Sequence, residues 1–223
     1  MNRIGEIQTP LPAPQTVLIG LLVAIVVTAP ELWSVLTHAN TVAHEGAHVL
    51  VGIGVGRTIQ SMRINSDGGG GTVMVPGSGF GFCVAAFAGY LGAGVFGLIA
   101  AKLISIGRIA VVLFLCLLLC VVMLLVVRNF FGGRVILICG ALLYLILRYA
   151  TTGVETAVAY SVTWFLLISG TKDAFVIIRT PKDIQDAKVL ASMTYIFRSA
   201  WCFLWLSGSV IALVIGGRIL IRG

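Results

Sequence analysis

Long apolar stretches, separated by short polar ones, run through almost the whole chain. A membrane-spanning helix needs about 20 mostly apolar residues. Stretches of this kind lie near residues 16–37, 39–56, 80–105, 109–127, 135–150, 153–171 and 190–216. Those at 39–56 and 135–150 are short, so each could be tilted or half-buried against its neighbours instead of crossing independently. The pattern predicts a mainly α-helical, polytopic transmembrane bundle of about six to seven membrane segments.

The region from Arg57 to Gly79 breaks the helical pattern. Side chains in residues 59–64 alternate with the two-residue period of a β-strand, a run of glycines ends at Gly71, and a second short strand-like run follows to Pro76. This order predicts a β-hairpin with a glycine-rich turn. Because a hairpin edge with unpaired backbone groups cannot face lipid, the hairpin should lie at the membrane interface or be covered by helices.

Two further features modify the helical pattern. The segment from Gly170 to Lys188 is polar and forms a second break. Within residues 80–105, Gly89, Ala93 and Gly97 recur at every fourth position. Small residues at that spacing let helix backbones approach closely in lipid, so this stripe predicts tight helix packing.

The composition predicts that the whole chain is a membrane domain. Of 223 residues, 59% are hydrophobic and 10% are charged, whereas about a quarter of the residues in a soluble domain are charged. Since the apolar residues are spread over the full length, we predict one integral membrane domain over residues 1–223 with no soluble domain. It divides into a tail at 1–15, the first helices at 16–56, the hairpin at 57–79 and the remaining transmembrane helices at 80–216.

The net charge of +7 does not indicate nucleic-acid binding, because the basic residues are dispersed singly and form no basic stripe. They are typical of topology determinants, since cytoplasmic loops of membrane proteins are enriched in Lys and Arg. On this rule three loops should be cytoplasmic, those that carry Arg57 and Arg63, Arg128 and Arg134, and Lys172, Arg179, Lys182 and Lys188. Lys102, Arg108 and Arg148 lie in the alternate loops and count against the assignment.

The strongest chemical signal is an H-E-x-x-H motif formed by His44, Glu45 and His48. Two histidines four residues apart lie on one face of a helix, where both imidazoles can bind one Zn²⁺. Glu45 follows the first histidine and can take a proton from a water on the metal and pass it to the leaving amine. The motif therefore predicts a zinc centre with Glu45 as general base, and zinc is the only cofactor expected.

The alternative without a function is that these polar residues fall near the end of an apolar helix by chance and face a loop. The chain contains only three histidines and eight acidic residues, so a chance match to this motif is improbable. Ionisable groups among membrane helices are also costly unless they are paired or bind a metal. Both arguments favour the zinc interpretation.

A catalytic zinc site needs a third protein ligand and keeps one open position. His38 precedes His44 by six residues, which is the wrong helical phase for the same face. Glu31 and Asp67 have loop-like surroundings, and Glu155 lies near a predicted helix start, where an acid is favourable through the helix dipole alone.

Two later aspartates are better candidates for the third ligand. Asp173 is flanked on both sides by membrane-like sequence, and we expect it to be the ligand; Asp186 is the second choice. The alternative for either carboxylate is a solvated charge in a cytoplasmic loop, paired with Lys172 or Lys182.

These residues together resemble the site-2 protease-like membrane zinc metallopeptidases, in particular a compact branch without a PDZ domain. The resemblance rests on HEGAH after an apolar segment, GGGGT in the hairpin, AGYLG at a helix start and a late Asp-Ala pair. It implies that His44 and His48 hold the metal, that Glu45 is the base, and that an aspartate on a later helix completes the site. It also implies that the hairpin at 57–76 lines the substrate entrance. The Leu-Asp-Gly element of better-known members is absent from this chain.

The leading functional hypothesis is an intramembrane zinc metalloprotease that cleaves membrane-protein or peptide substrates. The expected partners are that substrate and the lipid bilayer, and the expected location is a plasma membrane, with the active site nearer the cytoplasmic side. One alternative is a non-catalytic membrane subunit or chaperone that keeps the protease fold. Another is a small transporter, against which stands the lack of two repeated halves with broken helices.

Overall fold

A computed structural model describes residues 2–179 and 184–222 of the chain. In this part the backbone forms one short 3-10 helix, eight α-helices and two β-strands. In chain order they are η1 (Asn2–Gly5), α1 (Ala13–Thr28), α2 (Pro30–Gly54), β1 (Thr58–Ile64), β2 (Gly70–Val75), α3 (Phe80–Ser105), α4 (Ile109–Val126), α5 (Phe130–Tyr149), α6 (Thr152–Ile177), α7 (Gln185–Thr194) and α8 (Arg198–Arg222). The mainly helical architecture with a small hairpin after the H-E-x-x-H helix confirms the predicted fold class.

Five of the described helices, α3, α4, α5, α6 and α8, are long and apolar enough to cross a membrane. The pair α1 and α2 also passes this test, but the two helices meet at an angle of 101°. Counted as one broken crossing, the pair brings the number of candidate spans to six. The chain is therefore an integral, multi-pass membrane protein.

The break between α1 and α2 does not lie where the apolar pattern predicts it. We expected separate segments at 16–37 and 39–56, whereas one helix ends at Thr28 and the next begins at Pro30. Ala29 between them is extended, with ψ 119°. Pro30 lacks a backbone N–H and disfavours a helical residue before it, so α1 cannot continue through this position.

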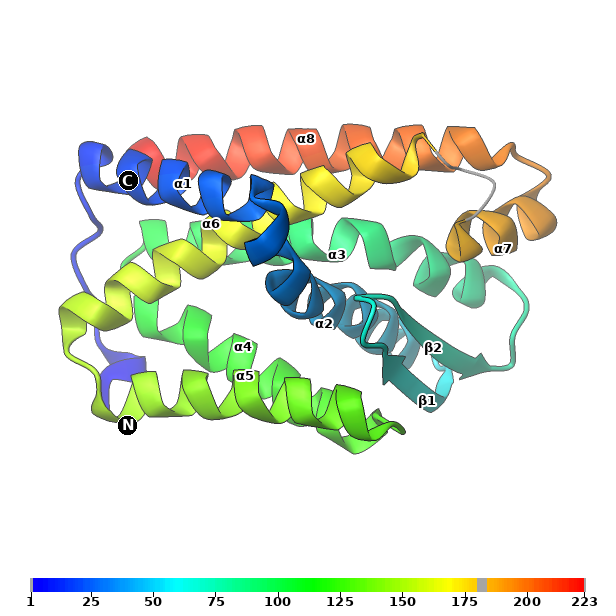
Figure 1. Ribbon diagram of the computed structural model, residues 1–223, viewed down its shortest axis with the longest axis horizontal. Coiled ribbons are helices and arrows are strands. Elements are labelled where there is room, and N and C mark those ends of the chain that lie inside the picture. Colours follow the sequence, from blue (N-terminus) through cyan, green and yellow to red (C-terminus); the bar gives the residue numbers. More distant parts are fainter. Residues whose placement is uncertain (1, 180–183, 223) are drawn as a thin grey trace.

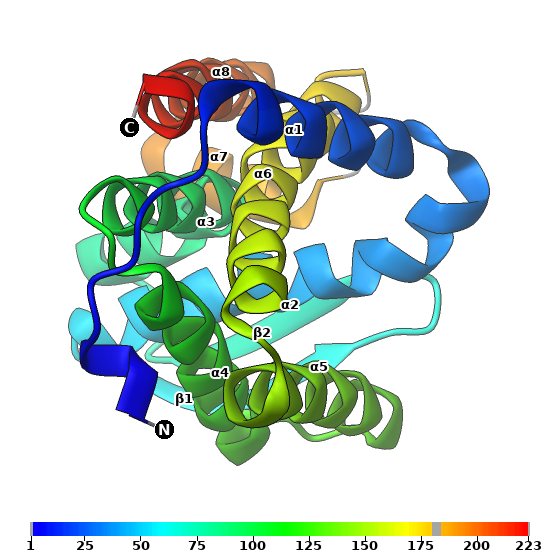
Figure 2. The same cartoon turned by 90° about the vertical axis from the view of Figure 1, so that its left-hand side faces the viewer.

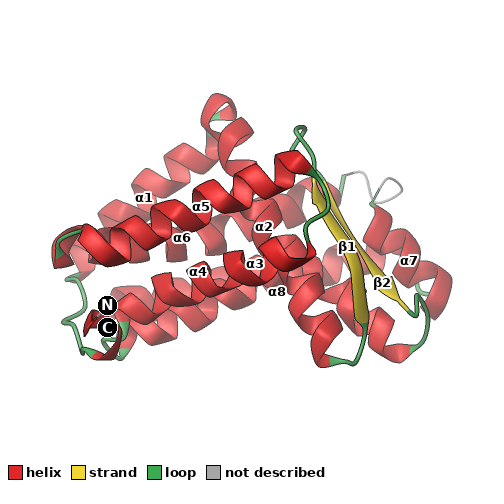
Figure 3. Cartoon of the chain, turned by 90° about the horizontal axis from the view of Figure 1, so that it is seen from below, coloured by secondary structure: helices red, strands yellow, loops and turns green. Residues whose placement is uncertain are grey.

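The helices form three tiers, with α1 and α8 in the top tier, α3 and α6 in the middle and α4 and α5 at the bottom (Figures 1 and 2). The chain termini lie together at one end of the molecule, and the hairpin and α7 lie at the other end (Figures 1 and 3). We call this second end the hairpin end. An even number of crossings would have this consequence. The basic loops that carry Arg57 and Arg63, and Arg128 and Arg134, share the hairpin end.

Helix α3 packs against α2, α6 and α8 and so lies at the centre of the bundle. Small residues make these contacts close. A Cβ added to Gly97 would lie 2.8 Å from Leu167 in α6, and one added to Gly170 of α6 would lie 3.1 Å from the Cβ of Ala93. The stripe predicted from small-residue spacing thus lies at helix contacts, where association in lipid depends on van der Waals packing.

The hairpin is fixed to the bundle by the outer edge of β1. Met62 forms a parallel bridge with Val127, and the amide of Arg128 donates to the Met62 carbonyl at 2.9 Å. The side-chain amide of Asn129 bonds the backbone N–H and C=O of Ile64 at 3.2 and 2.6 Å. Strand β2 pairs with β1 on its inner side, and no strand pairs with its outer edge within the described residues.

Candidate metal centre

The two motif histidines lie one helical turn apart on α2 and point toward the same space. Their Nε2 atoms are 3.1 Å apart, and their rings meet edge to face at 4.8 Å between centroids. The Nδ1 atom of His48 donates to the carbonyl oxygen of Ala85 in α3 at 2.7 Å. Because a carbonyl can only accept, Nδ1 carries a proton, so the neutral ring is the tautomer whose Nε2 lone pair can bind a metal.

Asp186 faces both histidines from the first turn of α7. Its Oδ2 atom lies 3.3 Å from Nε2 of His44 and 3.3 Å from Nε2 of His48. Burial by itself raises the pKa of Asp186, but the hydrogen bonds to His44 and His48 and their charge bring that pKa below its ordinary value. Asp186 is therefore held as a carboxylate, the form that ligates a metal.

Packing of α7 places this carboxylate. Ala187 and Leu190 of α7 are buried in a cluster with Cys202 and Trp205 of α8. Trp205 in turn donates from its indole nitrogen to the carbonyl of Phe87 in α3 at 2.9 Å. The short helix is thus fixed against α3 and α8, and its N-terminal turn, where an acid is electrostatically favoured, faces the histidines.

The donor atoms of His44, His48 and Asp186 lie within 4.8 Å of one another. Two imidazoles and one carboxylate are a donor set typical of catalytic zinc, which takes three protein ligands. Gly89 of α3 leaves the adjoining space open, because a Cβ there would come 2.4 Å from His48 Nε2 and 2.7 Å from His44 Nε2. The residues and the space around them fit a zinc ion.

Asp173, the aspartate that we expected first, lies beside this group and outside it. It is on α6 and accepts a hydrogen bond from the side-chain amide of Asn40, whose Oδ1 accepts from Ser169 at 2.8 Å. Lys172 does not pair with it; the ammonium donates to the Val27 carbonyl at 2.7 Å. Among the described residues the geometry brings the second choice, Asp186, to the histidines. Lys182, a partner considered for either aspartate, is outside the described residues.

The other acids considered as ligands, and the third histidine, are away from the histidine pair. His38 bonds the Val35 carbonyl at 3.0 Å and packs against Phe131. Asp67 accepts from the amide of Gly69 in the hairpin turn, and Glu155 is fully buried and bonded to Gln8. Glu31 is in the first turn of α2. None of them belongs to the group of donors found in the described part of the chain.

Glu45 is almost fully buried, at 3% exposure, beneath β2. Its Oε2 atom accepts a hydrogen bond from the hydroxyl of Thr72 at 2.6 Å. Tyr90 closes another side of the centre, with its ring edge-on to that of His44 at 4.5 Å and packed on Trp205 at 4.7 Å. Thr72, Ala85 and Gly89 were not predicted as site residues, since only their three-dimensional contacts give them a role.

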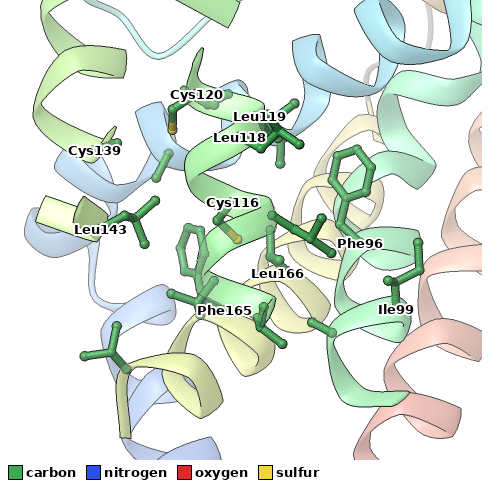
Figure 4. A pocket seen from close by; sticks show the side chains of 18 of the residues that line it. Phe96, Ile99, Cys116, Leu118, Leu119, Cys120, Cys139, Leu143, Phe165 and Leu166 are labelled. Atoms are coloured by element: carbon green, nitrogen blue, oxygen red, sulfur yellow. The ribbon is translucent and has the colours of Figure 1, made fainter. Parts of the chain in front are cut away.

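A cavity of about 540 Å³ is a separate feature (Figure 4). Apolar side chains of α2 to α6 line it, together with the thiols of Cys116, Cys120 and Cys139. All three of these cysteines are free. Because no charged or metal-ligating carboxylate or imidazole lines it, the cavity is not the candidate catalytic site.

The bundle of membrane-length helices and the histidine–aspartate group define a class, that of polytopic membrane proteins with a metallopeptidase motif. The Peptidase M50B-like family matches residues 17–216, so the chain belongs to this family, the site-2 protease family of membrane metalloproteases. Neither a curated protein nor a solved structure is significantly similar to the chain.

Proposed function

We propose that this protein is an intramembrane zinc metalloendopeptidase in which His44, His48 and Asp186 hold the metal. The observation that carries the proposal is the convergence of the two Nε2 atoms and Oδ2 within 4.8 Å. Family membership supports the same chemistry at a coarser level. Asp173 is the competing candidate for the third ligand. Because it is hydrogen-bonded to Asn40 and lies outside the donor group, its substitution is the matched control for substitution of Asp186.

In this proposal Glu45 is the general base and the later general acid. Zinc held by His44, His48 and Asp186 would lower the pKa of a bound water to about 7 and would polarise the substrate carbonyl. The water oxygen bonds to the peptide carbonyl carbon while its proton passes to Glu45. The C–N bond then breaks, and the same proton passes from Glu45 to the leaving amine. Burial of Glu45 excludes bulk water from these transfers.

The substrate class follows from the surroundings of the centre. A helical membrane segment hides its backbone, so it must be extended before its peptide bond can be attacked. The outer edge of β2 can hold an extended peptide through backbone hydrogen bonds, and Thr72 of the same strand touches Glu45. We therefore propose membrane-protein or peptide substrates that pair with β2 at the hairpin end.

Orientation in the membrane follows from the basic loops. The loops that carry Arg57 and Arg63, and Arg128 and Arg134, lie at the hairpin end together with α7 (Figure 1). The positive-inside rule places that end in the cytoplasm. We propose that the active site is nearer the cytoplasmic face and that the bilayer is a plasma membrane.

The test of the reaction is the Glu45→Gln variant of the purified full-length chain, assayed on dye-labelled casein and on single-span membrane proteins in proteoliposomes. Loss of the general base should lower hydrolysis by about 100-fold or more. The zinc content should stay that of wild type, because Glu45 is not a ligand. An inactive wild type would point to the non-catalytic subunit instead, and a variant as active as wild type would contradict Glu45 as the general base.

A further inference from the structure

Glu45 contacts the hairpin through a hydrogen bond from Thr72. The Thr72 hydroxyl at 2.6 Å is the one hydrogen-bond donor to the Glu45 side chain within residues 2–179 and 184–222. A hydroxyl–carboxylate bond of this length is in the range of charge-assisted bonds, which are stronger than neutral ones. A carboxylate that is 3% exposed requires such a donor, because burial removes the water that would solvate it.

Gly70, two residues before Thr72, brings the strand backbone against the same carboxylate. A Cβ at Gly70 would lie 2.6 Å from Oε1 of Glu45 and 2.8 Å from Cγ2 of Thr41. Thr41, one helical turn before Glu45, has its hydroxyl 2.5 Å from the carbonyl oxygen of Gly68. Two contacts on one face of α2 therefore fix the hairpin over the base, and Oε1 is the oxygen left without a donor in the described chain.

The strand geometry separates this contact from the surface that a substrate would use. Thr72 and Met74 face the bundle, whereas Val73 and Val75 face outward at 51% and 41% exposure. A peptide that pairs with the outer edge of β2 lies in the plane of the sheet and bonds to backbone groups. Pairing of this kind leaves the Thr72 side chain on Glu45.

We propose that Thr72 is a positioning residue for the general base, and that β2 thereby joins substrate docking and base placement in one strand. This inference rests on the proposed protease function. Thr72 holds Oε2, so that Oε1 takes the proton of the attacking water and later gives it to the leaving amine. Gly70 lets the strand backbone lie against the same carboxylate, because a Cβ at this position would come 2.6 Å from Oε1.

The test compares Thr72→Val, which keeps the shape and removes the donor, with Thr72→Ser, which restores it. Both variants are made in the full-length chain and assayed with dye-labelled casein as the substrate. The matched control is Thr58→Val, because Thr58 is an exposed threonine of β1. We expect Thr72→Val to lower kcat by about tenfold or more, with KM and zinc content unchanged. Thr72→Ser and Thr58→Val should both stay within about threefold of wild type.

Three outcomes would overturn the positioning role: a Thr72→Val variant as active as wild type, equal losses in Thr72→Val and Thr72→Ser, or loss of zinc from Thr72→Val. The first excludes the hydrogen bond as a factor, and the other two assign Thr72 to the fold alone. Failure of the proposed function is distinguishable, because it appears as an inactive wild type or an active Glu45→Gln.

Discussion

At the scale of single residues, the centre combines side chains whose roles depend on what surrounds them. His48 is oriented by the Ala85 carbonyl, Glu45 by Thr72, and Asp186 by its place in the first turn of α7. Each of these contacts joins α2 to a different element. The motif on α2 thus supplies the reacting groups, while α3, β2 and α7 determine where those groups point.

Gly89 gives a direct test of how closely α3 approaches the imidazoles. Alanine at this position would bring a Cβ 2.4 Å from His48 Nε2, so the ring must shift and lose its alignment. We expect Gly89→Ala to weaken zinc binding by about tenfold or more, measured by competition with a chelator. Gly153→Ala is the control, because a Cβ there meets nothing within 4 Å. Unchanged zinc affinity in Gly89→Ala would refute the close approach.

Site residues on one helix could be predicted, and those from separate elements could not. The four-residue spacing of His44 and His48 alone places both on one helix face. The third ligand that we propose comes from elsewhere in the chain, and no spacing rule relates Asp186 to α2. Its membrane-like flanks made Asp173 the more attractive candidate, yet that carboxylate is bonded to Asn40. Thr72 and Gly89 gave no chemical signal, because a hydroxyl in a strand and a small residue in a helix are common.

At the scale of elements, apolar length predicted the helices that are candidate membrane spans, because a helix satisfies all its backbone hydrogen bonds within one segment in lipid. The hairpin was also predicted, from alternation and the glycine run. Two features, the boundary between α1 and α2 and the helix α7, were not predicted, for different reasons. The α1–α2 boundary depends on Pro30 and not on hydropathy, and α7 is a ten-residue helix inside a polar segment, too short for a hydropathy pattern to reveal.

The elements also explain why the hairpin can serve a substrate without unfolding. Backbone bonds from Arg128 and the side chain of Asn129 cover the outer edge of β1. Buried Met62, Ile64 and Met74 then hold the sheet on the bundle. One edge is thus satisfied within the protein, and β2 presents the other edge next to Glu45.

At the scale of the whole molecule, we propose that the broken α1–α2 pair makes one crossing, which would put both termini on one side of the membrane and the hairpin end on the other. We expect a membrane-impermeant maleimide to distinguish Asn65→Cys in the hairpin turn from Thr151→Cys between α5 and α6. In intact cells Thr151→Cys should be labelled and Asn65→Cys should react only after permeabilisation, with wild type as the control for native thiols. The reverse order would contradict a cytoplasmic hairpin end.

The most direct test of the central claim is the zinc content of the detergent-purified chain, measured by elemental analysis without chelators. We predict about one zinc per chain in wild type, in line with a single set of three ligands. The metal should be lost in His44→Ala and Asp186→Asn and retained in Asp173→Asn. Absence of zinc from wild type would contradict the metal centre, and its loss from Asp173→Asn but not from Asp186→Asn would contradict the ligand set proposed for it.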